Sequence, residues 1–115
     1  MKKENRIKKA TEIENVLKNR KLRSTKYFSV YIFNNKETTK FRYAISAGKK
    51  IGNAVARNKV KRQVRSIVDS ITSLDQCLDV FIIVRPTVVN TDFSILNKDL
   101  TYLFKKLNIK LQGEI

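Results

Sequence analysis

The sequence contains no histidine and only one cysteine, Cys77. Such a chain cannot form an internal disulfide, a zinc site of cysteine and histidine ligands, or a nucleophile activated by histidine. Its 10 acidic residues are scattered without a D-x-D or similar cluster, which gives carboxylate catalysis little basis. We therefore expect no catalytic residues and no metal site in the protein, and a role for Cys77 as a small core residue.

Glycine, proline and long apolar runs are also scarce. With 3 glycines and 1 proline, no interdomain linker, repeat or low-complexity segment is visible, and 115 residues suffice for one core. We therefore expect a single domain over residues 1–115. No segment approaches the roughly 18 consecutive apolar residues of a membrane-spanning helix, and the first residues do not resemble a signal peptide. The sequence thus predicts a cytoplasmic protein that does not bind a membrane.

Positive charge is what the sequence has in excess. It contains 25 Lys and Arg against 10 Asp and Glu, which gives a formal net charge of +15. Self-repulsion of this size destabilises a compact fold, and phosphate groups of a nucleic acid would neutralise it with release of counterions. The composition therefore favours a polyanionic partner.

The first half of the chain predicts a helix followed by a hairpin. Thr11 and Glu14 have the spacing of a capping box, and Ile13, Val16 and Leu17 follow at helical spacing. Residues 27–33 alternate as in a strand. Residues 34–40 read as a polar turn, and residues 41–46 as the hairpin partner of that strand.

The second half predicts a buried strand between two helices. Residues 80–84 form a continuous apolar run, typical of a strand buried on both faces. Thr91 or Asp92 can cap a last helix. Its expected apolar stripe consists of Phe93, Leu96, Leu100, Leu103, Phe104 and Leu107. This order of elements describes a small α/β sandwich.

Residues 48–65 combine a glycine-bracketed basic loop with the start of the earlier helix. Asn53 is a plausible N-cap. The apolar side of this helix is expected to consist of Ala56, Val60, Val64, Ile67, Val68 and Ile71. A stripe beside it, within about 140° at about 100° per residue, consists of Arg57, Asn58, Lys61, Arg62 and Arg65.

The basic stripe is free of acidic residues, since no Asp or Glu occurs between residues 49 and 68. A stripe of Lys and Arg kept for solubility would normally lie opposite the core and include acid–base pairs. We therefore expect the stripe to bind a polyanion, with Lys49, Lys50 and the free amides at the helix start as a second anion site. Charge alone does not separate RNA from DNA.

The run from Gly52 to Arg65 resembles the Arg-Asn-Arg signature of the bacterial ribonuclease P protein family. Arg57 and Asn58 match the signature, and Lys59 stands where the family usually has arginine. The likeness extends over nearly the whole chain. It implies a catalytic RNA as partner, bound by Lys49, Lys50, Asn53, Arg57, Asn58, Lys61, Arg62 and Arg65.

The resemblance also implies a fold, a second site and a cofactor. The fold is an α+β sandwich of αβββαβα order, similar to the second domain of ribosomal protein S5, with a left-handed βαβ crossover. A cleft receives the 5′ leader of precursor tRNA, and its matching positions are Ile13, Leu17 and Tyr31. The first two of these are commonly aromatic in the family. Magnesium is bound by the RNA and the substrate, and the protein assists removal of the leader.

Three other classes of function fit the sequence less well. A general RNA-binding or ribosomal protein would share the charge but would not need the run from Gly52 to Asn58. A DNA-binding module would favour a compact helical pair over the strand-rich middle of this chain. A nuclease acting without RNA would need acid–base or metal-binding residues that the sequence lacks.

Overall fold

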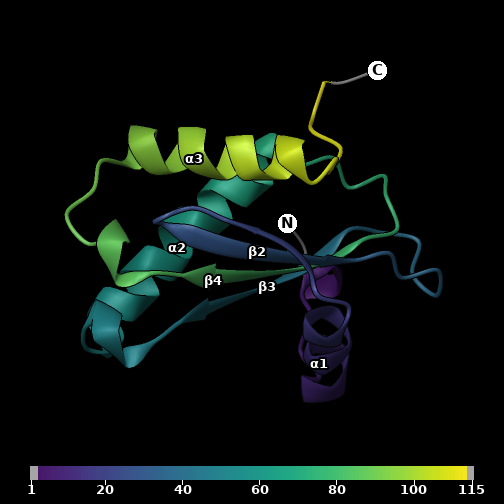
Figure 1. The fold of residues 1–115 in the computed structure, drawn as a ribbon, viewed down its shortest axis with the longest axis horizontal. Helices are drawn as coiled ribbons and strands as arrows, with labels where there is room; N and C mark the ends of the chain where they lie inside the picture. The colour runs from purple at the N-terminus through teal and green to yellow at the C-terminus, as the bar shows by residue number, and fades with distance from the viewer. Residues whose placement is uncertain (1–2, 114–115) are drawn as a thin grey trace.

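The computed structural model describes residues 3–113 and contains three α-helices and one four-stranded sheet (Figure 1). Met1, Lys2, Glu114 and Ile115, which the predicted domain includes, lie outside the described residues. The elements are η1 (Lys3–Asn5), α1 (Ala10–Lys18), β1 (Lys21–Ser24), β2 (Phe28–Phe33), β3 (Arg42–Ala47), η2 (Lys49–Ile51), α2 (Ala54–Ile71), β4 (Asp79–Val84), η3 (Pro86–Val88) and α3 (Phe93–Lys106). Their order confirms the predicted αβββαβα arrangement.

The sheet has the strand order β1-β2-β4-β3. β2 pairs antiparallel with β1 and β4, whereas β3 pairs parallel with β4. The predicted hairpin between residues 27–33 and 41–46 is therefore wrong, because β4 lies between these two strands. β2 forms its hairpin with β1, whose four residues are all exposed and show no apolar alternation. The left-handed sense of the β3–α2–β4 connection stays a prediction.

One face of the sheet carries the core. Alternate residues of β2 and β4 point to this face, and they are Phe28, Val30, Ile32, Val80, Ile82 and Val84. They pack with buried residues of α2 and α3, namely Val60, Val64, Ile67, Val68, Leu96, Leu100, Leu103 and Phe104. α3 lies on one side of the sheet and α1 on the other (Figure 1). We call the side of the sheet that carries α1 the open face.

Of the predicted N-terminal helix caps, the structure confirms only some. Asn53 caps α2 as predicted, because its Oδ1 accepts a hydrogen bond from the Ala56 amide at 2.9 Å. The capping box at Thr11 is wrong, since α1 begins at Ala10 and Thr11 lies inside the first turn. Asp92 occupies the N-cap position of α3 without a side-chain cap.

Three predictions about burial are wrong. Cys77 is exposed, because the loop before β4 turns it outward and buries the neighbouring Leu78. Phe93 is exposed at the first position of α3, because the buried residues of this helix begin only at Leu96. β4 is fully buried on one face only, since Phe81 and Ile83 on the open face remain half-buried.

Candidate nucleic-acid interface

Helix α2 presents the predicted stripe as one basic face, which we define as Arg57, Asn58, Lys61, Arg62 and Arg65. The neighbouring side of α2 is fixed in the core by its buried residues Val60, Val64, Ile67 and Val68. Arg57, Lys61 and Arg65 are half-buried, and Asn58 and Arg62 are exposed. The basic face therefore borders the core as predicted, and its outer part is open to a ligand.

A hollow of about 410 Å³ lies along the outer part of the basic face. It is lined by Val55, Asn58, Arg62 and Arg65. Val55 is 75% exposed, so an apolar side chain stands beside two guanidinium groups and an amide. This combination suits a nucleotide, because guanidinium groups bind phosphate and stack on bases while an amide pairs with a base edge or ribose.

Negative charge on α2 is confined to its C-terminal end. The only acidic residue of the helix is Asp69, whose Oδ1 accepts a hydrogen bond from the Tyr43 hydroxyl at 3.5 Å. The pKa of Tyr43 is raised to about 12, mainly by burial and also by the Asp69 carboxylate, while the positive charges of Arg6 and Arg65 oppose the shift. The N-terminal three turns of α2 thus carry positive charge only.

Arg57 has an unsatisfied donor at the border of the core. Its Nε is buried, and no hydrogen-bond acceptor is within reach of it among residues 3–113. A buried donor without an acceptor typically costs about 1 to 3 kcal/mol. Groups left in this state often lie where a ligand, ion or water supplies the acceptor.

The η2 turn places two lysines beside the start of α2. Lys49 and Lys50 are exposed, whereas Ile51 is buried and anchors the turn. Gly52 has φ of 147°, and a Cβ at this position would meet the Ala56 Cβ at 3.0 Å. The turn therefore packs closely on α2 only with glycine here, and the two lysines extend the positive surface around the helix start.

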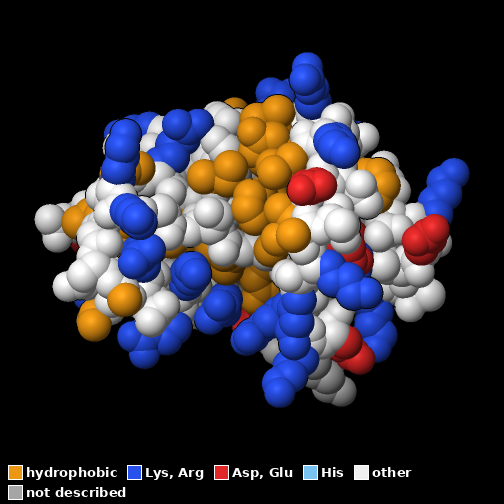
Figure 2. Space-filling view, turned by 90° about the horizontal axis from the view of Figure 1, so that it is seen from below, with side chains coloured by type: hydrophobic (Ala, Val, Ile, Leu, Met, Phe, Trp, Pro, Cys, Tyr) orange, Lys and Arg blue, Asp and Glu red, His pale blue; other side chains and the backbone are white. Residues whose placement is uncertain are grey.

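The open face contains an apolar strip across the middle of the sheet. We define the strip as the paired residues Leu22, Tyr31, Phe81 and Ala44, one from each strand. Tyr31 and Phe81 are both half-buried, so parts of two aromatic rings are accessible. Figure 2, which looks onto this side, shows apolar side chains gathered across the centre with Lys and Arg on both sides.

Helix α1 borders the strip with its aliphatic flank. Val16 is fully buried and points at the sheet, and at about 100° per residue Ile13 and Leu17 lie on one flank of it. Glu12 lies on the other flank, which faces a polar hollow of about 390 Å³. The half-buried Ile13 and Leu17 therefore face the centre of the sheet, and the structure brings them together with Tyr31 on the open face.

Sequence reasoning missed two residues of the open face. The sequence predicts Phe81 as part of a fully buried run, whereas its pairing with Tyr31 puts it in the strip. Arg85, which follows β4, donates from Nη2 to Ser29 Oγ at 2.7 Å and so lies over the row of residues next to the strip. The alternation of β4 would have identified Phe81 if its partner strand had been known.

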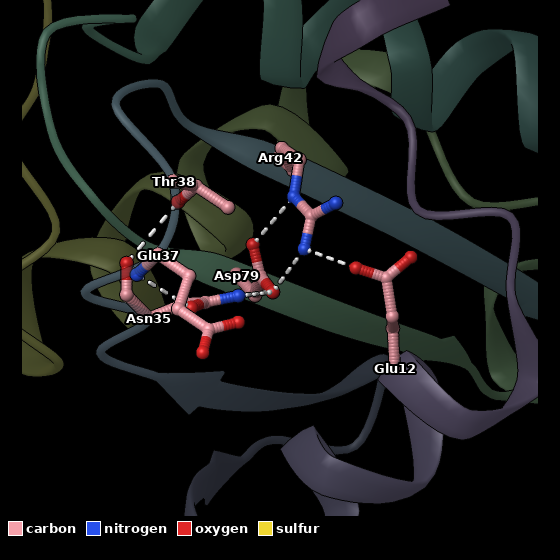
Figure 3. Close-up of polar contacts among 6 residues, drawn as sticks. All are labelled: Glu12, Asn35, Glu37, Thr38, Arg42 and Asp79. Atoms are coloured by element: carbon pink, nitrogen blue, oxygen red, sulfur yellow. Dashed lines mark hydrogen bonds and ion pairs between the residues drawn. The ribbon is translucent and has the colours of Figure 1, made fainter.

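A group of polar residues joins α1 to the end of the sheet (Figure 3). We call it the corner network, and it consists of Glu12, Asn35, Arg42 and Asp79. Asp79 is 1% exposed and accepts from Arg42 Nε at 3.0 Å, Arg42 Nη2 at 2.7 Å and Asn35 Nδ2 at 3.0 Å. Arg42 Nη2 also lies 2.7 Å from Glu12 Oε2. The hydrogen bond to Asp79 raises the pKa of Arg42 above its ordinary value, so its charge is permanent.

Metal binding and membrane insertion find no support in the described part of the chain. Among residues 3–113, no group of three or more His, Cys, Asp or Glu side chains is placed to hold a metal ion. No helix in that range is long and apolar enough to cross a membrane.

Comparisons with known proteins agree on one family. The family model described as Ribonuclease P matches residues 1–108. The ribonuclease P protein component of Bacillus cereus is 38% identical over 111 residues, which cover 96% of both chains. The structure of the Staphylococcus aureus RNase P protein has a TM-score of 0.81 at 31% identity, covering 91% of this chain and 96% of that one. The RNase P protein from Thermotoga maritima has a TM-score of 0.75 at 26% identity, covering 88% and 96%.

Proposed function

This chain belongs to the ribonuclease P protein family, and from that premise we propose how it binds its RNA partners. The family is the protein component of ribonuclease P, which processes the 5′ ends of tRNAs, so the chain has the RNA of that enzyme as a partner. We assign binding of this catalytic RNA to the basic face of α2 with Lys49, Lys50 and Asn53. We assign the 5′ leader of precursor tRNA to the open face of the sheet.

The acid-free basic face is the observation that carries the assignment to the catalytic RNA. Like charges repel along it at i,i+4 spacing, as between Arg57 and Lys61, and a phosphate backbone would relieve this repulsion. Arg62 and Arg65 offer planar donors for phosphate beside the hollow, and Asn58 offers a donor and an acceptor. Arg57 adds a third, half-buried guanidinium group to this face.

Accessible aromatic rings support the assignment of the leader to the open face. Single-stranded RNA is commonly bound by stacking of bases on aromatic side chains, and Tyr31 and Phe81 form a pair of neighbouring rings in the strip. Ile13 and Leu17 add aliphatic contacts from α1. Arg85 lies close enough to the strip to contact a leader phosphate.

Bond breaking is assigned to the RNA. We propose that Mg²⁺ is bound by the catalytic RNA and the substrate phosphate, and that the protein contributes affinity for both RNAs. Hydrolysis would leave a 5′-phosphate on the mature tRNA. We also propose that the protein acts in the cytoplasm, because its relatives are bacterial ribonuclease P protein components.

Reconstitution tests the proposed function. The purified chain is mixed with a ribonuclease P RNA and precursor tRNA at a magnesium concentration too low for the RNA alone. We expect cleavage only when both RNA and protein are present, and none with the protein alone. Cleavage by the protein without RNA, or no gain over the RNA alone, would contradict the proposal.

A further inference from the structure

The corner network holds α1 at one end of the open face. Arg42 belongs to β3 and is fixed there, because two of its nitrogens bond to the buried carboxylate of Asp79. The second oxygen of Asp79 also accepts from Asn35, in the loop after β2. Arg42 is thus a rigid anchor of the sheet, and its Nη2 reaches Glu12 of α1.

Few other contacts fix the position of α1. The helix has nine residues, a length at which an isolated helix is marginal in water. Val16 is its only buried residue, and the residue at its N-cap position provides no side-chain cap. At the other end, Asn19 Nδ2 donates to the Ile32 carbonyl at 3.0 Å. The ion pair of Glu12 is therefore a main link between the first turn of α1 and the sheet.

Glu12 is placed to control the rotation of α1 about its own axis. It lies on one flank of the buried Val16, and Ile13 and Leu17 lie on the other. If the Glu12 contact is lost, α1 is free to turn about Val16, and its aliphatic flank no longer keeps a fixed position beside the strip.

We infer that Glu12, through Arg42, is a positioning residue that sets α1 in the orientation in which Ile13 and Leu17 border the leader site. This inference rests on the proposed leader binding at the open face. Glu12 contacts no RNA in this scheme. Its effect on the leader passes entirely through the position of α1.

The test compares Glu12→Gln with Glu14→Gln, which removes the same charge from the exposed side of the same helix. Glutamine keeps the shape of Glu12 but loses the ionic bond to Arg42. In the free protein, we expect amide hydrogen exchange in α1 to become faster in Glu12→Gln and to stay unchanged in β2 and β4. Glu14→Gln should leave exchange in α1 as in the wild type.

The second measurement uses the enzyme reconstituted with ribonuclease P RNA. Loss of the docked orientation reduces the binding-competent fraction, so Glu12→Gln should weaken binding of leader-bearing precursor tRNA by about threefold to tenfold. Binding of mature tRNA and kcat at saturating substrate should not change. A merely structural defect would lower affinity for both tRNAs together.

The two measurements test the role of Glu12 separately from the proposed leader site. Unchanged exchange in α1, or faster exchange with unchanged affinity for the leader-bearing substrate, overturns the positioning role of Glu12. A wild-type enzyme that binds precursor and mature tRNA equally overturns the proposed leader site itself. In that case the exchange data still show whether Glu12 holds α1.

Discussion

The corner network and the basic face of α2 both contain arginine, but their surroundings differ in charge. Arg42 lies against two carboxylates, those of Asp79 and Glu12. From Arg57 to Arg62, the charged side chains three or four positions away along α2 are all cations, and the first acidic residue of the helix is Asp69, four residues after Arg65. Arg42 is therefore expected to stabilise the fold, whereas the proposed function assigns the arginines of the basic face to a polyanion.

This difference predicts opposite responses to mutation. Removing one member of a buried ion pair leaves the other charge uncompensated, which is strongly destabilising. Removing a charge from a surface of like charges relieves repulsion and changes mainly the affinity for the partner. Three of the four predictions below test this contrast, and the one on Tyr31 tests the proposed leader site.

The largest expected effect is on stability, in Arg42→Ala. This change leaves the buried carboxylate of Asp79 without its cation, which should lower the free energy of unfolding by about 3 to 5 kcal/mol. Urea denaturation of the free protein measures it. The control is Lys40→Ala, which breaks an ion pair with Glu4 between half-exposed side chains and should cost less than about 1 kcal/mol. Equal losses in the two variants would show that burial does not strengthen the network.

The next effect is on substrate binding, in Tyr31→Ala. If a leader base stacks on this ring, affinity of the reconstituted enzyme for precursor tRNA should fall by about 1 to 3 kcal/mol, with mature tRNA unaffected. Thermal melting must first show that the variant is folded. Tyr102 on α3 is 51% exposed and offers a matched control, since Tyr102→Ala removes a ring far from the open face. Equal losses for precursor and mature tRNA would make Tyr31 a structural residue.

A smaller effect concerns the salt dependence of binding to ribonuclease P RNA. Lys61→Ala and Arg65→Ala should each flatten the slope of log affinity against log salt by about 0.7 to 0.9, the value of one phosphate contact. Lys105→Ala on α3 removes an exposed charge outside the basic face and should not alter the slope. If both α2 variants keep the wild-type slope, the basic face is only a solvated surface.

Local patterns in the sequence predicted the basic face well. The periodicity of α2 and its cap at Asn53 depend on residues within a few positions of each other, and the structure has both. The placement of the basic residues beside the core follows from the same helical spacing. None of this requires knowledge of distant parts of the chain.

Strand order and the corner network depend on distant pairings and were not predicted. The insertion of β4 between β2 and β3 joins segments separated by the whole of α2. Without that pairing, Phe81 could not be placed next to Tyr31, and Asp79 could not be placed next to Arg42. The resemblance implied a strand at this place in the order, but local patterns did not locate β1 because its exposed residues lack the apolar alternation that marks a strand.

The smallest predicted effect is a gain in stability, in Lys61→Gln. Lys61 lies four residues from both Arg57 and Arg65, and each like-charge pair at this spacing costs about 0.2 to 0.5 kcal/mol. Glutamine has a similar helix propensity and keeps most of the aliphatic stem, so the repulsion is the main quantity that changes. We expect the free protein to unfold at a slightly higher urea concentration at low salt, and the gain to vanish at high salt because the charges are then screened.

The control for this gain is Lys98→Gln on α3, where the residues three and four positions away are all uncharged. The same change in net charge should leave stability unaltered there, which separates local repulsion on α2 from a general effect of the high net charge. A loss of stability in Lys61→Gln would mean that Lys61 has a stabilising partner within the protein. The basic face would then resemble the corner network, with charges that serve the fold, and the contrast between the two regions would fail.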